Sequence, residues 1–149
     1  MGLQQQVMEQ MKAAMKSKDK VALESLRAIK SALLLAQTET GSGTEMSEED
    51  EVKLVQKLVK QRKDSAAIFI EQGRQDLADP ELAQVAVIEQ FLPEQLSEEE
   101  VEKVVVQVIE TTGASGMKDM GKVMGMVSKQ LAGQADGKTI STIVKNKLS

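Results

Sequence analysis

Several residue types are missing from this 149-residue chain, and their absence limits its chemistry. It contains no cysteine, histidine, tryptophan or tyrosine, and its aromatic residues are Phe69 and Phe91. A thiolate nucleophile, an imidazole base and a zinc site built from cysteine and histidine are therefore excluded. Stacking of bases on aromatic rings, the usual mode of binding single-stranded nucleic acid, is also practically unavailable.

Long hydrophobic runs are lacking as well. Residues 1–20 contain no apolar segment typical of a signal peptide, and no later run is long enough to span a bilayer. The absence of cysteine agrees with a reducing compartment. We therefore expect a cytoplasmic protein without a membrane partner. With 41% hydrophobic residues, the chain can form one or two small domains with real cores.

Apolar residues recur with helical spacing along the N-terminal part, and no alternating strand pattern is present. The expected apolar face of the first helix consists of Leu3, Val7, Met8, Met11 and Met15. A second helix, capped by Asp19, should bury Ala22, Leu23, Leu26, Ile29 and Leu33. The segment Thr38–Met46, with two glycines, is expected to form a flexible loop.

Two further helices are expected before residue 93. Ser47 and Asp50 resemble a capping box and should begin a long helix that stops near Gly73. Asp79 followed by Pro80 predicts another helix start, because proline is favoured at the first helical position. This helix should run to about Phe91.

The turn chemistry around Pro93 predicts a domain boundary. Ser97 and Glu100 form a second capping-box pattern, and the helix that they begin should end near Gly113. Two shorter helices should follow, separated by residues 133–137. We therefore predict an all-α fold with an N-terminal domain of about four helices, residues 1–93, and a C-terminal three-helix domain, residues 94–149.

The acidic runs 48–51 and 98–100 could be metal ligands or an acid–base pair. Both begin expected helices just after a serine, where negative charge complements the helix dipole. We therefore interpret them as capping features and expect no catalytic residue, no metal and no cofactor. The segment Gly133–Lys138 superficially resembles a phosphate loop, but its GxxxGK spacing is one residue short and no strand precedes it. Asp136 is instead expected to cap the last helix.

The segment 117–132 sorts its residues by size as well as by polarity. One helical face carries the apolar residues Met117, Met120, Val123, Met124, Val127 and Leu131. The other carries Lys118, Gly121, Lys122, Gly125, Ser128, Lys129 and Ala132. Glycine inside a helix costs about 1 kcal/mol relative to alanine. This pattern therefore suggests that another helix, or the phosphates of a nucleic acid, comes close to the helix backbone.

Charge is unevenly distributed along the chain. Residues 113–149 contain six lysines and two aspartates, a net charge of +4, whereas residues 1–112 carry −8. Such asymmetry favours an anionic partner for the basic part, although ordinary surface lysines explain it equally well.

Together these segments resemble the GatB/YqeY family, specifically its free-standing YqeY-like members. The resemblance covers nearly the whole chain and is clearest in the glycine–lysine block. It is carried by Asp119–Gly125, Gly133–Lys138, Ile143–Val144 and Leu148, and supported by Leu26–Arg27, Lys60–Ser65, Gly73–Leu77 and Phe91–Pro93.

The resemblance implies a relation to the helical tail of the B subunit of the tRNA-dependent amidotransferase, which helps to hold the tRNA body. The name of that family implies carbon–nitrogen ligase activity with glutamine as amide donor. This chain looks like the tail without the domain that uses ATP and magnesium. We therefore expect no amidotransferase turnover by the chain alone and no small-molecule substrate.

Our leading hypothesis is a non-catalytic tRNA-binding or transamidation-associated module. Its expected RNA contacts are Lys118, Gly121, Lys122, Gly125, Lys129 and Lys138. One alternative is a helical protein–protein interaction module that binds no RNA. The other is an amidotransferase component that is active only in complex. The expected partners are tRNA, amidotransferase subunits or other translation proteins.

Overall fold

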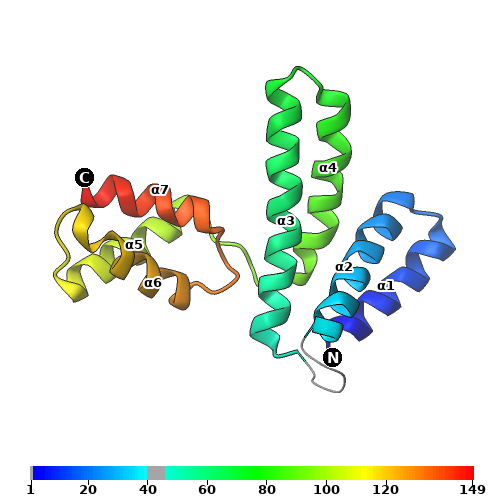
Figure 1. The fold of residues 1–149 in the computed structure, drawn as a ribbon, viewed down its shortest axis with the longest axis horizontal. Helices are drawn as coiled ribbons and strands as arrows, with labels where there is room; N and C mark the ends of the chain where they lie inside the picture. Colours follow the sequence, from blue (N-terminus) through cyan, green and yellow to red (C-terminus); the bar gives the residue numbers. More distant parts are fainter. Residues whose placement is uncertain (1, 40–45) are drawn as a thin grey trace. The chain divides into compact units, whose positions relative to one another are not determined.

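The computed structural model of the chain describes residues 2–39 and 46–149. Its helices are α1 (Leu3–Ser17), α2 (Lys20–Glu39), α3 (Glu48–Glu71), α4 (Gln75–Ile88), α5 (Glu98–Thr112), α6 (Met120–Gln130) and α7 (Gly137–Leu148). Short 3₁₀ turns, η1 (Glu89–Phe91) and η2 (Met117–Asp119), follow α4 and precede α6. The described ranges contain no strand, so the predicted all-α class is confirmed (Figure 1). Most of the predicted loop at 38–46 lies outside the described residues, and Thr38 belongs to α2.

Contacts between backbone positions divide the chain into two compact units, with the division between Leu92 and Pro93. In the N-terminal unit, α1 and α2 form one helical hairpin and α3 and α4 form another, with α2 packed against α4 (Figure 1). The C-terminal unit consists of α5, α6 and α7, each in contact with the other two. Each unit has its own apolar cluster. Independent folding of 1–93 and 94–149 stays a prediction.

Local capping signals determine where several helices begin. The hydroxyl oxygen of Ser47 accepts a hydrogen bond from the backbone N–H of Asp50, 3.1 Å away, at the start of α3. Ser97 accepts from the backbone N–H of Glu100 at 3.2 Å and starts α5 in the same way. The carboxylate of Asp19 accepts from the N–H of Ala22 at 3.1 Å. These contacts confirm the predicted caps, because each satisfies an otherwise unpaired first-turn N–H group.

The predicted apolar face of α1 is partly wrong. Leu3, Val7 and Ala14 are buried, but Met8 and Met15 are 44% and 53% exposed. Each exposed methionine directly follows a buried residue, so it points about 100° away from the packed side of the helix. Residue type alone suggested a wider buried face than the packing of α1 on α2 provides.

The predicted start of α4 is also wrong. The helix begins at Gln75, and Pro80 lies inside it. Gly73 has a positive φ of 73° and makes the turn from α3, where glycine avoids the clash of a side chain. The next residues can therefore enter a helix at once, and Ala78 packs with 0% exposure before Pro80 is reached. Pro80 removes one backbone hydrogen bond and its ring crowds the carbonyl four residues earlier, a cost that the packing of α4 has to offset.

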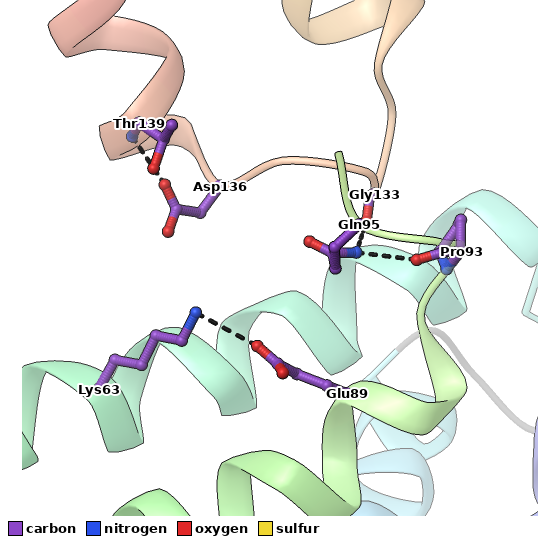
Figure 2. Close-up of polar contacts among 7 residues, drawn as sticks. All are labelled: Lys63, Glu89, Pro93, Gln95, Gly133, Asp136 and Thr139. Carbon is purple, nitrogen blue, oxygen red and sulfur yellow. Dashed lines mark hydrogen bonds and ion pairs between the residues drawn. The ribbon is translucent and has the colours of Figure 1, made fainter. Parts of the chain in front are cut away.

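Polar contacts connect the helices of the N-terminal unit. The guanidinium of Arg62 donates from Nε to the side-chain oxygen of Gln84 at 2.8 Å, which joins α3 to α4. Lys63 Nζ lies 3.2 Å from Glu89 Oε1 and links α3 to η1 (Figure 2). In the part of the chain described here, no helix is long and apolar enough to cross a membrane.

Candidate nucleic-acid interface

Helix α6 is held against the C-terminal core by its apolar side. Val123 and Val127 have 0% exposure and Leu131 has 4%, and they belong to one cluster with the buried residues of α5 and α7. A carboxylate oxygen of Asp119 accepts a hydrogen bond from the backbone N–H of Ser115 at 2.9 Å, which closes the turn that leads into the helix. The rotation of α6 about its axis is therefore set by three buried side chains, one turn apart.

The predicted core face of α6 is correct for the central residues and wrong at one end. Met120 and Met124 are partly buried against the core, as expected. Met117 is 45% exposed and does not belong to the buried face. It lies in the 3₁₀ turn η2, before α6 begins, so the spacing of the helix does not extend to it.

The two glycines of the opposite face are exposed and leave the helix surface open. A Cβ atom added at Gly121 or at Gly125 would meet no non-neighbouring atom within 4 Å. Packing against another helix of the described chain therefore does not account for either glycine. Because glycine lowers helix stability, its presence twice on this face is consistent with an external partner that approaches the backbone.

The predicted lysines surround these glycines on the surface. Lys118, Lys122 and Lys129 are exposed. A spacing of seven residues places Lys122 and Lys129 on one side of α6, and Lys118 lies just before the helix, in η2. None of the three takes part in an ion pair within the described ranges, whereas Lys147 on α7 lies 2.6 Å from Glu102 of α5. Their charges are therefore not neutralised by this unit. We call Lys118, Gly121, Lys122, Gly125 and Lys129 the α6 basic face.

Lys138 follows this face along the chain, after the turn that joins α6 to α7. It is exposed in the first turn of α7, and Lys129 lies in the last turn of α6. The N-terminus of α7 is closed by Asp136, whose carboxylate accepts from the backbone N–H of Thr139 at 2.7 Å (Figure 2). This contact confirms the predicted cap.

The turn between α6 and α7 is hydrogen-bonded to the segment that follows Pro93. The side-chain amide of Gln95 donates to the carbonyl oxygen of Gly133 at 2.6 Å and to that of Pro93 at 2.9 Å (Figure 2). The backbone N–H of Leu96 donates to the carbonyl oxygen of Gln134 at 2.9 Å. Gly133 is buried with a positive φ of 79°, which brings its carbonyl into reach of this segment without the strain of a side chain.

The contact of Gln95 is not predictable from the sequence. Local sequence predicts an interruption between helices at residues 92–96 and, separately, a turn at residues 133–137. The two segments are 38 residues apart, and no local pattern connects a glutamine to a distant carbonyl. Proline and glycine did identify both segments as turns, which is the part of the arrangement that local sequence can reveal.

The acidic runs lie at the starts of α3 and α5. Both lie in first turns, where Ser47 and Ser97 cap the helices that they begin. In the residues that the structure describes, no group of three or more acidic side chains is placed so that it could hold a metal ion. Their positions agree with stabilisation of the helix N-termini by negative charge.

Two known proteins are similar to this chain in sequence. The chain is 42% identical over 73 residues to the E subunit of the glutamyl-tRNA(Gln) amidotransferase of Thermococcus gammatolerans. That match covers 46% of this chain but only 12% of the archaeal protein. It is 31% identical over 127 residues to the altered inheritance of mitochondria protein 41 of Pyrenophora tritici-repentis, with 84% of this chain and 68% of that protein covered.

The family comparison covers almost the whole chain. A family model described as Yqey-like protein matches residues 4–148, which include all seven α-helices except the first residue of α1. The relation to an amidotransferase subunit, which the sequence motifs implied, appears again in the archaeal relative. This chain belongs to the YqeY-like protein family.

Proposed function

We propose that this protein is a non-catalytic module that binds tRNA in association with transamidation. The observation that carries the proposal is the α6 basic face, on which unpaired lysines surround two exposed glycines. Lysine side chains are suited to phosphates as flexible point charges, and a surface without side chains between them lets a phosphate backbone come close. The similarity to an amidotransferase subunit supports tRNA as the RNA concerned.

Binding by this face should depend on RNA shape rather than base sequence. Phosphate contacts provide affinity and register but do not read bases, and the chain has almost no aromatic side chains for stacking. Structured RNA is recognised largely through its backbone and groove shape. We therefore expect a preference for folded tRNA over unstructured RNA of equal length.

The test measures binding of a fluorescently labelled tRNA transcript to the full chain by fluorescence anisotropy. The variant Lys122→Glu/Lys129→Glu should lose tRNA binding, because it replaces two positive charges of the interface by negative ones. Both side chains lie opposite the buried Val123 and Val127, so the charge reversal should not disturb the core. The matched control is Lys57→Glu/Lys103→Glu, which makes the same charge change at exposed positions on α3 and α5.

Binding of tRNA by Lys122→Glu/Lys129→Glu as tight as that of the unaltered protein would refute the proposed interface. A similar loss of binding in both double variants would instead indicate attraction by overall charge alone. Unstructured RNA that binds as tightly as tRNA would contradict the expected preference for shape. Far-UV circular dichroism of each variant verifies that the helices are intact.

A second candidate function is a component of an amidotransferase assembly. The match to the archaeal amidotransferase protein favours it, although that match covers a small part of the relative. The chain contains neither cysteine nor histidine, and in this second function we expect activity only together with other subunits. A complex that copurifies with amidotransferase subunits after RNase treatment would support this function.

A further inference from the structure

The second surface of interest is the outward side of α1 together with the turn into α2. It contains the exposed side chains Met8, Lys12, Met15, Lys16, Lys18, Lys20 and Val21, which we call the α1 surface. All of these residues belong to the N-terminal unit, so the α1 surface shares no residue with the proposed tRNA contact.

This surface is exposed because of the way α1 packs in the N-terminal unit. The helix packs chiefly against α2, at the edge of the N-terminal unit, so none of the described helices of that unit covers its other side (Figure 1). Met8 and Met15 are two turns apart on that side, with exposures of 44% and 53%, and Val21 at the start of α2 has 40%. Lys12 lies between the two methionines, so apolar and cationic groups alternate along one stripe.

The charge of this surface is mainly positive. Residues 8–21 contain four lysines and two acids, Glu9 and Asp19, and the carboxylate of Asp19 is engaged as a helix cap. None of the four lysines forms an ion pair with any residue in the described ranges 2–39 and 46–149. A partner that adds carboxylates would therefore gain attraction without breaking an existing pair.

We propose that the α1 surface docks an acidic amphipathic helix of another protein. Unbranched, polarisable methionine side chains adapt to the apolar face of such a helix, and the lysines complement its carboxylates. The 15-residue α1 is about 22 Å long and matches a partner helix of about four turns. An RNA backbone would leave the methionines in water, and a bilayer surface would favour the aromatic residues that α1 and the turn lack.

The test uses a synthetic 18-residue peptide with leucine on one helical face and glutamate on the other. Full-length ¹⁵N-labelled protein is titrated with the peptide and followed by NMR. We expect chemical-shift changes confined to residues 5–21. A scrambled peptide of the same composition should bind about ten-fold more weakly, because it lacks the apolar face.

Protein variants separate the charge contribution from the apolar one. Lys12→Glu/Lys16→Glu should weaken the binding of the amphipathic peptide about ten-fold, since it converts two attractions into repulsions. The control Lys57→Glu/Lys103→Glu should bind as the unaltered protein does. Met8→Gln/Met15→Gln should also weaken binding, by several-fold at least, because it removes apolar area without changing charge.

Three results would overturn the proposal. The first is equal affinity for the amphipathic and scrambled peptides, which would mean that charge alone attracts them. The second is stronger perturbation of residues 5–21 by a tRNA transcript or by phosphatidylcholine–phosphatidylserine vesicles than by the peptide. The third is no shift at millimolar peptide. The α6 basic face is tested by separate variants. A negative result for peptide binding at the α1 surface therefore leaves the tRNA proposal unaffected.

Discussion

The side-chain amide of Gln95 donates a hydrogen bond to the carbonyl oxygen of Gly133, 2.6 Å away across 38 residues of sequence. The bond ties the segment after Pro93 to the turn that joins α6 and α7. Lys129 and Lys138 lie on either side of that turn. The turn between these two lysines of the proposed RNA interface is thus bonded to a residue that contributes no charge.

Replacement of Gln95 should therefore lower stability. Gln95→Glu removes the donor and places a carboxylate beside two carbonyl oxygens, so we expect a loss of about 1–3 kcal/mol in the free energy of unfolding. Urea denaturation followed by circular dichroism measures this loss. Gln107→Glu is the control, because it makes the same chemical change at an exposed position of α5. Equal losses in the two variants would show that the Gln95 contact contributes nothing.

The exposed glycines of α6 should oppose stability and favour binding. Gly121→Ala/Gly125→Ala should raise the free energy of unfolding, by roughly 0.5–1 kcal/mol per site, because both positions are helical and the added Cβ meets open space. The same substitutions should weaken tRNA binding if phosphates approach the backbone there. Urea denaturation and anisotropy measure the two effects. Increased stability with unchanged tRNA affinity would argue against a close approach.

Salt should weaken tRNA binding in a predictable way. Three or four lysine–phosphate contacts release counterions and should give a log–log slope of about −2 to −4, with about 0.7–0.9 per phosphate. Anisotropy titrations at several salt concentrations provide the slope. Lys122→Glu should make the log–log slope less steep by about 0.7–0.9, the contribution of one phosphate contact. A slope near zero would exclude phosphate contacts as the main source of affinity.

The start of α4 contains an ion pair whose titration can be followed. Arg74 donates to Asp76 at 2.9 Å and holds the pKa of that carboxyl below its ordinary value. A lowered carboxyl pKa stabilises the fold above the unfolded-state pKa, and this contribution disappears as pH falls through the folded-state value. Arg74→Gln should therefore raise the pKa of Asp76, measured by ¹³C NMR of the carboxyl group. An unchanged midpoint would mean that Arg74 does not pair with Asp76 in solution.

The two units should fold separately. Their apolar clusters share no buried residue, and the boundary between them falls at Pro93. Fragments 1–93 and 94–149, produced individually, should each give dispersed ¹⁵N–¹H NMR spectra that overlay on the corresponding signals of the full chain. A fragment that is unfolded alone but folded in the intact chain would contradict this division.

The sequence by itself determined the features that depend on neighbouring residues. Ser47, Ser97 and Asp136 predicted helix starts correctly, because a capping side chain reaches an N–H group only three residues away. The buried side of α6 could be predicted for the same kind of reason. Helical spacing places Val123, Val127 and Leu131 on one side, and no competing apolar face exists there. The exposure of the lysines opposite followed directly.

Only the tertiary structure decided which of several allowed local choices was made. Met8 and Met15 have the same apolar character as buried residues, but α2 covers only one side of α1 and leaves them outside. Pro80 resembles a helix start, yet packing of Ala78 allows α4 to begin earlier. Tertiary packing outweighs these local preferences, which are worth about 1 kcal/mol or less for most residues and about 3 kcal/mol for proline inside a helix.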